Sequence, residues 1–103
     1  MTDADETLLE AAERWVEEHR DGLVARGVEV RVSGPHDPVG MDPVYVVGLK
    51  SEHAEVDASL FRGGTILLAG YDKSTAAAMG PWHVDASIPG DVEAALTDLA
   101  SRA

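Results

Sequence analysis

The chain has 103 residues and carries 19 acidic against 8 basic side chains, which gives a net charge of −11 at neutral pH. Its length predicts one domain spanning residues 1–103, large enough to bury a single modest core. The negative charge argues against nucleic acid and anionic membrane surfaces as partners, because both favour a basic protein surface. The absence of Cys excludes disulfides and thiolate metal sites.

The N-terminal stretch MTDADETLLE is acidic, and no long apolar run follows it. A secretory signal begins with basic residues, and a membrane-spanning helix needs about 20 apolar ones, so neither is expected. Together with the lack of Cys, this pattern predicts a cytoplasmic protein.

Residues 7–20 have the periodicity of an amphipathic helix. Asp3 and Glu6 have capping-box spacing at its start, and Gly22 or Gly27 offers an end. The apolar positions share one helical stripe, while acidic side chains occupy the other faces. The stripe consists of Leu8, Ala12, Trp15, Val16, His19 and Leu23.

Four segments in the middle of the chain predict strands. Residues 28–32 alternate between apolar and polar, which is typical of a half-buried strand. Residues 33–43 hold three prolines and two glycines and therefore form a loop. Residues 44–50 are apolar on both faces, as in a central strand, and residues 55–61 and 65–71 form two more strands.

The C-terminal third predicts a loop, a strand and a helix. Residues 73–81 favour a loop, residues 82–87 a fifth strand, and residues 89–103 an amphipathic helix with proline in its first turn. The expected fold is therefore α+β: an N-terminal helix, an antiparallel sheet of four or five strands, and a C-terminal helix. Such a sheet usually carries its helices on one face.

Gly63-Gly64 predicts a two-residue hairpin turn, because glycine adopts the positive φ angles that such turns need. In the register that follows, Phe61 lies on the same face as Ile66 and Leu68, and the other face is also apolar. Either one helix covers each face, or one face stays uncovered, which is typical of an interface. The alternative is a bulge that shifts the register and makes one face polar.

The stretch GPWHVDAS places three chemically active side chains close together in sequence. On a strand, His83 and Asp85 point to one face while Trp82 and Val84 point to the other. We therefore expect Trp82 and Val84 on the core and His83 and Asp85 in solvent. The functional alternative makes His83 an acid–base group that Asp85 orients.

The proline-rich loop holds a second polar group, formed by His36, Asp37 and Asp42. Two carboxylates are too few for tight calcium binding, and Asp beside Pro and Gly is ordinary turn chemistry. We expect no metal and no cofactor here.

Sequence motifs for catalysis are missing from the chain. There is no Gly-x-Ser-x-Gly, no phosphate-binding Gly-x-x-x-x-Gly-Lys and no His-Glu-x-x-His. The expectation is a protein that is not an enzyme.

The stretches AAERWVEEH, ARGVEVRV, AEVDASLFRGGTILLAGYD and PGDVEAALTDLASRA follow one another along the chain. This layout resembles the TriTu-type small immunity proteins found beside bacterial polymorphic toxins, and in outline it is similar to secretion-chaperone-like folds. Both resemblances imply a non-catalytic protein that binds another protein.

The leading hypothesis is an acidic binding domain that occludes a protein partner, and the negative charge of the chain favours a basic one. Its candidate interface comprises Phe61, Ile66, Leu68 and Asp57, where apolar area supplies affinity and carboxylates supply steering. Two alternatives stay open: a homodimer that buries the apolar sheet face, and a small-ligand or enzyme domain that uses His83, Asp85 and His36.

Overall fold

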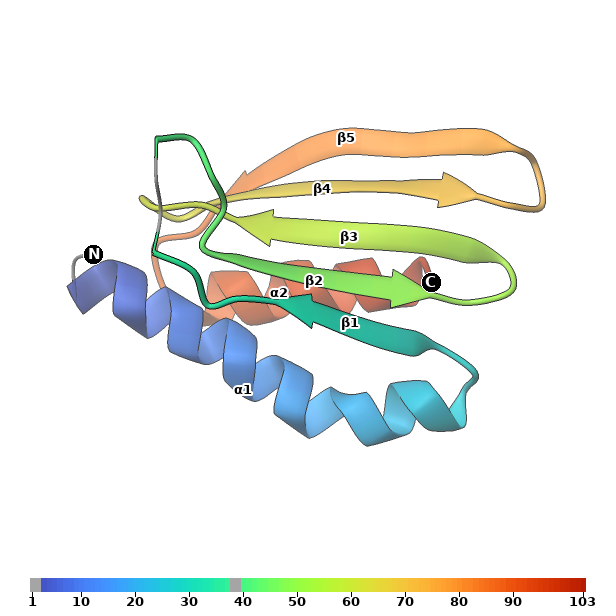
Figure 1. Ribbon diagram of the computed structural model, residues 1–103, viewed down its shortest axis with the longest axis horizontal. Helices are drawn as coiled ribbons and strands as arrows, with labels where there is room; N and C mark the ends of the chain where they lie inside the picture. The colour runs from blue at the N-terminus through green and yellow to red at the C-terminus, as the bar shows by residue number, and fades with distance from the viewer. Residues whose placement is uncertain (1–2, 38–39) are drawn as a thin grey trace.

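The computed structural model describes residues 3–37 and 40–103, so Pro38 and Val39 of the predicted loop lie outside the described residues. The described residues form two helices and one five-stranded antiparallel sheet, with the strands side by side in chain order (Figure 1). The elements are α1 (Asp3–Ala25), β1 (Glu29–Ser33), β2 (Tyr45–Lys50), β3 (Ala54–Leu60), β4 (Thr65–Asp72), β5 (Ala77–Asp85) and α2 (Pro89–Ser101).

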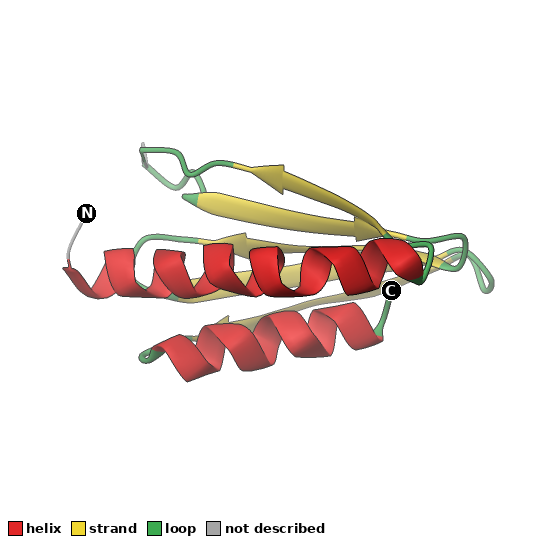
Figure 2. Ribbon diagram, turned by 90° about the horizontal axis from the view of Figure 1, so that it is seen from below, coloured by secondary structure: helices red, strands yellow, loops and turns green. Residues whose placement is uncertain are grey.

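Helices α1 and α2 pack side by side on the same face of the sheet (Figure 2). This arrangement confirms the predicted α+β fold, with an N-terminal helix, an antiparallel sheet and a C-terminal helix. Of the two helix arrangements left open by the sequence, the one with an uncovered sheet face is observed. In the described part of the chain, no helix is long and apolar enough to cross a membrane.

The first helix is longer than its apolar stripe predicts: it ends at Ala25 and is stopped by Gly27, one of the two expected stops. Gly27 has a φ of +82°, which glycine adopts without strain. The Val28 N–H donates to the Leu23 carbonyl at 2.9 Å, and the Gly27 N–H donates to the Val24 carbonyl at 3.0 Å. These two bonds form a Schellman motif, which turns the chain directly into β1.

The core lies between the helices and the sheet, with Trp15 near its centre. Trp15 is 2% exposed, and its indole N–H donates to the Thr97 hydroxyl on α2 at 3.1 Å. His19 stacks on the Trp15 ring, and its Nδ1 lies 2.7 Å from the Trp15 carbonyl oxygen. His19 is therefore an exposed residue at the rim of the core.

The predicted two-residue turn between β3 and β4 is wrong. The Phe61 N–H donates to the Thr65 carbonyl, and the Gly64 N–H donates to the Phe61 carbonyl, so the loop has three residues. Three-residue loops that place glycine at a positive φ are a common hairpin type. The carboxylate of Asp5 on α1 accepts a hydrogen bond from the Gly63 N–H at 2.8 Å, which ties this loop to the helix.

The longer loop shifts the register by one residue and exchanges the two faces of β4. Leu60 pairs with Ile66, and Ala58 pairs with Leu68. Ile66 and Leu68 are 2% and 0% exposed and belong to the core, so their predicted role in an interface is wrong. The register is therefore shifted, as in the alternative considered, but by the three-residue loop, and the outer face keeps the apolar side chains of Phe61 and Leu67.

Strand β5 confirms the expected fifth strand but begins earlier than its sequence pattern predicts. Residues 77–81 were expected in a loop and instead pair with β4. The pairing changes register between Leu68 and Gly70, opposite Gly80 and Pro81. An edge strand with a bulge tolerates proline, because its outward N–H needs no partner in the sheet.

Candidate functional site

The sheet face opposite α1 and α2, called the open face below, carries the residues of greatest functional interest (Figure 2). Strand alternation puts the buried residues of each strand toward the helices and their neighbours on the open face. The pairing registers line up five side chains across it in one row: Ser33, Val46, Ser59, Leu67 and His83.

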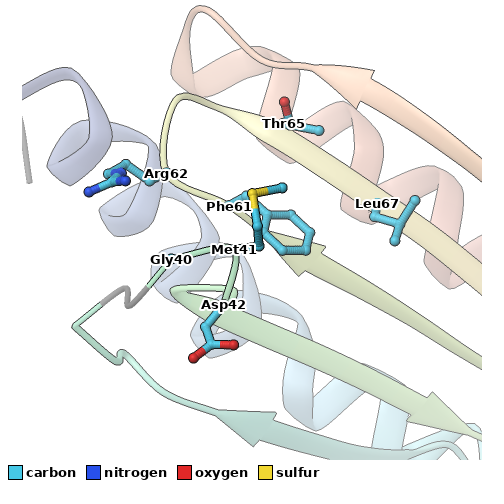
Figure 3. Close-up of a pocket in the computed structure, with 7 residues that line it drawn as sticks. All are labelled: Gly40, Met41, Asp42, Phe61, Arg62, Thr65 and Leu67. Carbon is cyan, nitrogen blue, oxygen red and sulfur yellow. The ribbon is translucent and has the colours of Figure 1, made fainter.

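An apolar pocket lies at one end of the open face, where Phe61 and Leu67 meet the loop before β2 (Figure 3). It has a volume of about 390 Å³, and Met41 from that loop contributes to its wall. Met41 is 87% exposed and Leu67 is 41% exposed. Asp42 and Arg62 stand among the residues that line it. An exposed apolar surface bordered by charges is typical of a protein-binding site.

The loop that carries Met41 is held against the sheet by its backbone. The His36 N–H donates to the Val44 carbonyl at 2.8 Å, and the His36 ring nitrogen lies 2.9 Å from the Ser33 hydroxyl. Gly34 has a φ of +108°, and a Cβ there would lie 2.6 Å from the Val44 carbonyl oxygen. His36 therefore has a structural role in positioning this loop.

The loop residues predicted as a polar group are separated by the structure. Asp42 lies at the pocket, whereas Asp37 is exposed and does not line it. Among residues 3–37 and 40–103, no three His, Asp or Glu side chains are arranged to hold a metal ion.

The Trp82, His83 and Asp85 group is divided between the two faces of β5, as strand periodicity predicts. Trp82 packs on the core side, where the Arg102 guanidinium lies 4.6 Å from its ring centroid. His83 and Asp85 are 65% and 76% exposed at their side chains, and their nearest atoms are 3.9 Å apart. His36 follows β1 and lies at the opposite edge of the sheet from β5, so it does not join them.

Three cations, Arg31, Lys50 and Lys73, are paired with neighbouring carboxylates. Arg31 lies 3.2 Å from Glu29 on β1, and Lys50 lies 3.4 Å from Glu55 on β3. Lys73 contacts the same Glu55 at 3.6 Å. Exposed pairs of this kind contribute little to stability, about 0–1 kcal/mol each. Each cation nevertheless already has a glutamate beside it.

Asp57 differs from these carboxylates, since it makes no hydrogen bond or ion pair with any residue that the structure describes. It lies on β3 between Gly48 of β2 and Ala69 of β4. Its outer surface is exposed, but removal of water by the surrounding sheet raises the pKa of the Asp57 carboxyl above 3.8. The open face thus presents a carboxylate that is exposed on its outer side and has no partner among the residues that the structure describes.

Two pocket residues, Met41 and Leu67, were not predicted from the sequence. A three-residue hairpin loop, had it been assumed from the sequence, would have predicted Leu67 on the same face as Phe61. Met41 carries no local signal, because its position depends on the path of the loop over the sheet.

No family model, curated protein or solved structure matches the chain.

Proposed function

We propose that this chain is an acidic, non-catalytic protein-binding domain whose open face occludes a basic protein partner. The observation that carries the proposal is the apolar pocket of Met41, Phe61 and Leu67, exposed on the sheet face opposite α1 and α2. Such a surface supplies area for binding, and the carboxylates around it supply steering.

The charge of the chain supports a basic partner rather than a second copy. Two copies, each with a net charge of −11, repel one another as they approach, whereas a basic surface is attracted. The same attraction would accelerate association at low salt. The lack of Cys fits a cytoplasmic location for this complex.

The geometry of His83 and Asp85 favours binding over catalysis. Their nearest atoms are too far apart for a hydrogen bond, and both side chains are largely in solvent. Thr65 donates a hydrogen bond to Asp85 at 3.2 Å, so this carboxylate already has a structural partner. An immunity or chaperone-like role, in which the domain covers a surface of its partner, agrees with these features.

The proposal is tested by capture from a lysate of the organism that encodes the chain, with three baits compared by mass spectrometry. The baits are the wild type, Phe61→Asp and Val24→Asp. Val24 is 58% exposed on α1, so its variant makes the same chemical change away from the open face.

We expect one basic protein to be retained by the wild type and by Val24→Asp, and to be lost from Phe61→Asp. Circular dichroism should show unchanged helix content in Phe61→Asp, because Phe61 lies outside the core cluster. Equal capture by a folded Phe61→Asp bait, or no protein specific to the wild type, would overturn the proposal.

A further inference from the structure

Two features of the open face lie on the same side of one extended segment. Phe61 lines the apolar pocket, and Asp57 precedes it by four residues on β3. Residues four apart in a strand point the same way, about 13 Å from one another. The Ser59 side chain lies between them and is small, so the surface is continuous from the pocket to the carboxylate.

The surroundings of Asp57 leave room for a side chain from another molecule. Gly48 on one side has no side chain, and Ala69 on the other side has only a methyl group. A hollow of about 170 Å³ adjoins Asp57 and Gly48. Tyr71, two residues beyond Ala69 on the same face of β4, pairs with Glu55 and is 45% exposed.

The resident cations do not neutralise this carboxylate. Arg31 and Lys50 line the same hollow, but each is paired with a glutamate. Two carboxylates line the hollow, Asp57 and the already paired Glu55, and they are too few for a metal ion. A guanidinium suits Asp57, since the planar group can bond a carboxylate and stack on a tyrosine ring.

We infer that the open face recognises a segment of a protein partner that presents an apolar side chain to the Met41–Phe61–Leu67 pocket and an arginine, about 13 Å away, to Asp57. This inference rests on the proposed function and specifies the chemistry of the bound segment. A second copy of the chain is a poorer occupant, because its net charge of −11 opposes the approach.

The test uses the full chain labelled with ¹⁵N and two synthetic peptides, acetyl-Trp-Ser-Ser-Ser-Arg-amide and the same peptide with citrulline in place of arginine. Citrulline keeps the shape of arginine without its charge. In an extended peptide the first and fifth side chains have the spacing of Phe61 and Asp57. Each peptide is titrated to millimolar concentration while amide chemical shifts are followed.

We expect both peptides to shift the amides of Phe61 and Leu67, and the arginine peptide to shift Asp57 as well. The arginine peptide should bind about two- to fivefold more tightly, the range of a partly exposed ion pair. Asp57→Asn should remove this difference. Glu17→Gln should preserve it, because Glu17 loses the same charge from an exposed position on α1.

Equal binding of the two peptides to the wild type, or an arginine preference that survives in Asp57→Asn, would overturn the inference. Absence of shifts with either peptide would overturn it too. These outcomes are distinct from failure of the proposed function, which the Phe61→Asp capture experiment decides with the natural partner.

Discussion

At the scale of single residues, the binding role proposed for Asp57 comes with a cost to the free protein. Partial removal of water by the surrounding sheet disfavours its ionised form in the folded chain, although its outer surface is exposed. A charged group without a partner in its own fold is typical of a functional site. Such sites often lower stability because their residues serve function and not packing.

This conflict predicts the effect of Asp57→Asn on the free protein. Because the folded pKa is raised, the folded state holds the proton to higher pH than the unfolded state. The contribution of Asp57 to the free energy of unfolding therefore falls as pH rises from 3.8 through the folded pKa. Above the folded pKa this destabilising contribution is constant. At neutral pH we expect Asp57→Asn to melt at a higher temperature than the wild type.

Thermal melts followed by circular dichroism at neutral pH and well below pH 3.8 check this prediction. At the acidic pH the Asp57 carboxyl is neutral in both states, so the melting temperatures of wild type and variant should converge. Glu17→Gln controls for the general effect of removing one negative charge. A variant less stable than the wild type at neutral pH would mean that Asp57 has an internal partner.

At the scale of elements, the hairpin between β3 and β4 determines which residues reach the open face. Its two glycines both have a positive φ, +93° at Gly63 and +95° at Gly64. Only Gly64 is also closely packed, since a Cβ there would overlap the Ala86 carbonyl oxygen and lie 3.2 Å from Leu8. A Cβ at Gly63 meets nothing within 4 Å.

The two glycines therefore make a matched pair. Gly63→Ala should cost about 1–2 kcal/mol of unfolding free energy, which is the penalty of a positive φ alone. Gly64→Ala has the same penalty plus the overlap with Ala86, so its cost should exceed that of Gly63→Ala. Urea denaturation of both variants measures the difference. Equal costs would show that the loop relaxes freely away from Ala86.

The same hairpin shows why the sequence predicts the strands but not their register. Residues 55–61 and 65–71 have clear strand patterns, yet Ile66, Leu67 and Leu68 are consecutive apolar residues. Alternation therefore does not indicate which of them faces the core, and Gly63-Gly64 is compatible with loops of two or three residues. The contact between Asp5 and Gly63, 58 residues apart, is a tertiary feature that local pattern does not contain.

Two of the site residues were predictable from the strand pattern of the sequence, whereas the site residue on a loop was not. Phe61 and Asp57 were predicted for an interface from strand periodicity, and both lie on the open face. Met41 was not predicted, because loops follow the surface that other elements provide. The early part of β5 was missed since Ala, Gly and Pro have low strand propensity, so its pairing with β4 depends on the sheet rather than on its own sequence.

At the scale of the whole molecule, charge and shape act together. The net charge of −11 produces a negative potential around a surface that also offers an apolar pocket. Apolar patches of this kind often favour self-association, but mutual repulsion opposes it here.

We therefore expect the isolated protein to be a monomer in light scattering at low salt, even when it is concentrated. Added salt screens the repulsion over roughly 10 Å at about 0.1 M, so any weak self-association should increase with ionic strength. A stable dimer at low salt would favour the homodimer hypothesis and would place a second copy on the open face.

The packing of α2 against α1 has a consequence for how the protein is made. The bond between Trp15 and Thr97 joins residues 82 positions apart, and α2 supplies Val92, Leu96 and Leu99 to the core. During translation the sheet emerges from the ribosome before the helix that covers part of its inner face. The nascent chain therefore exposes apolar surface on both sides until α2 has been synthesised, and complete folding must wait for that moment.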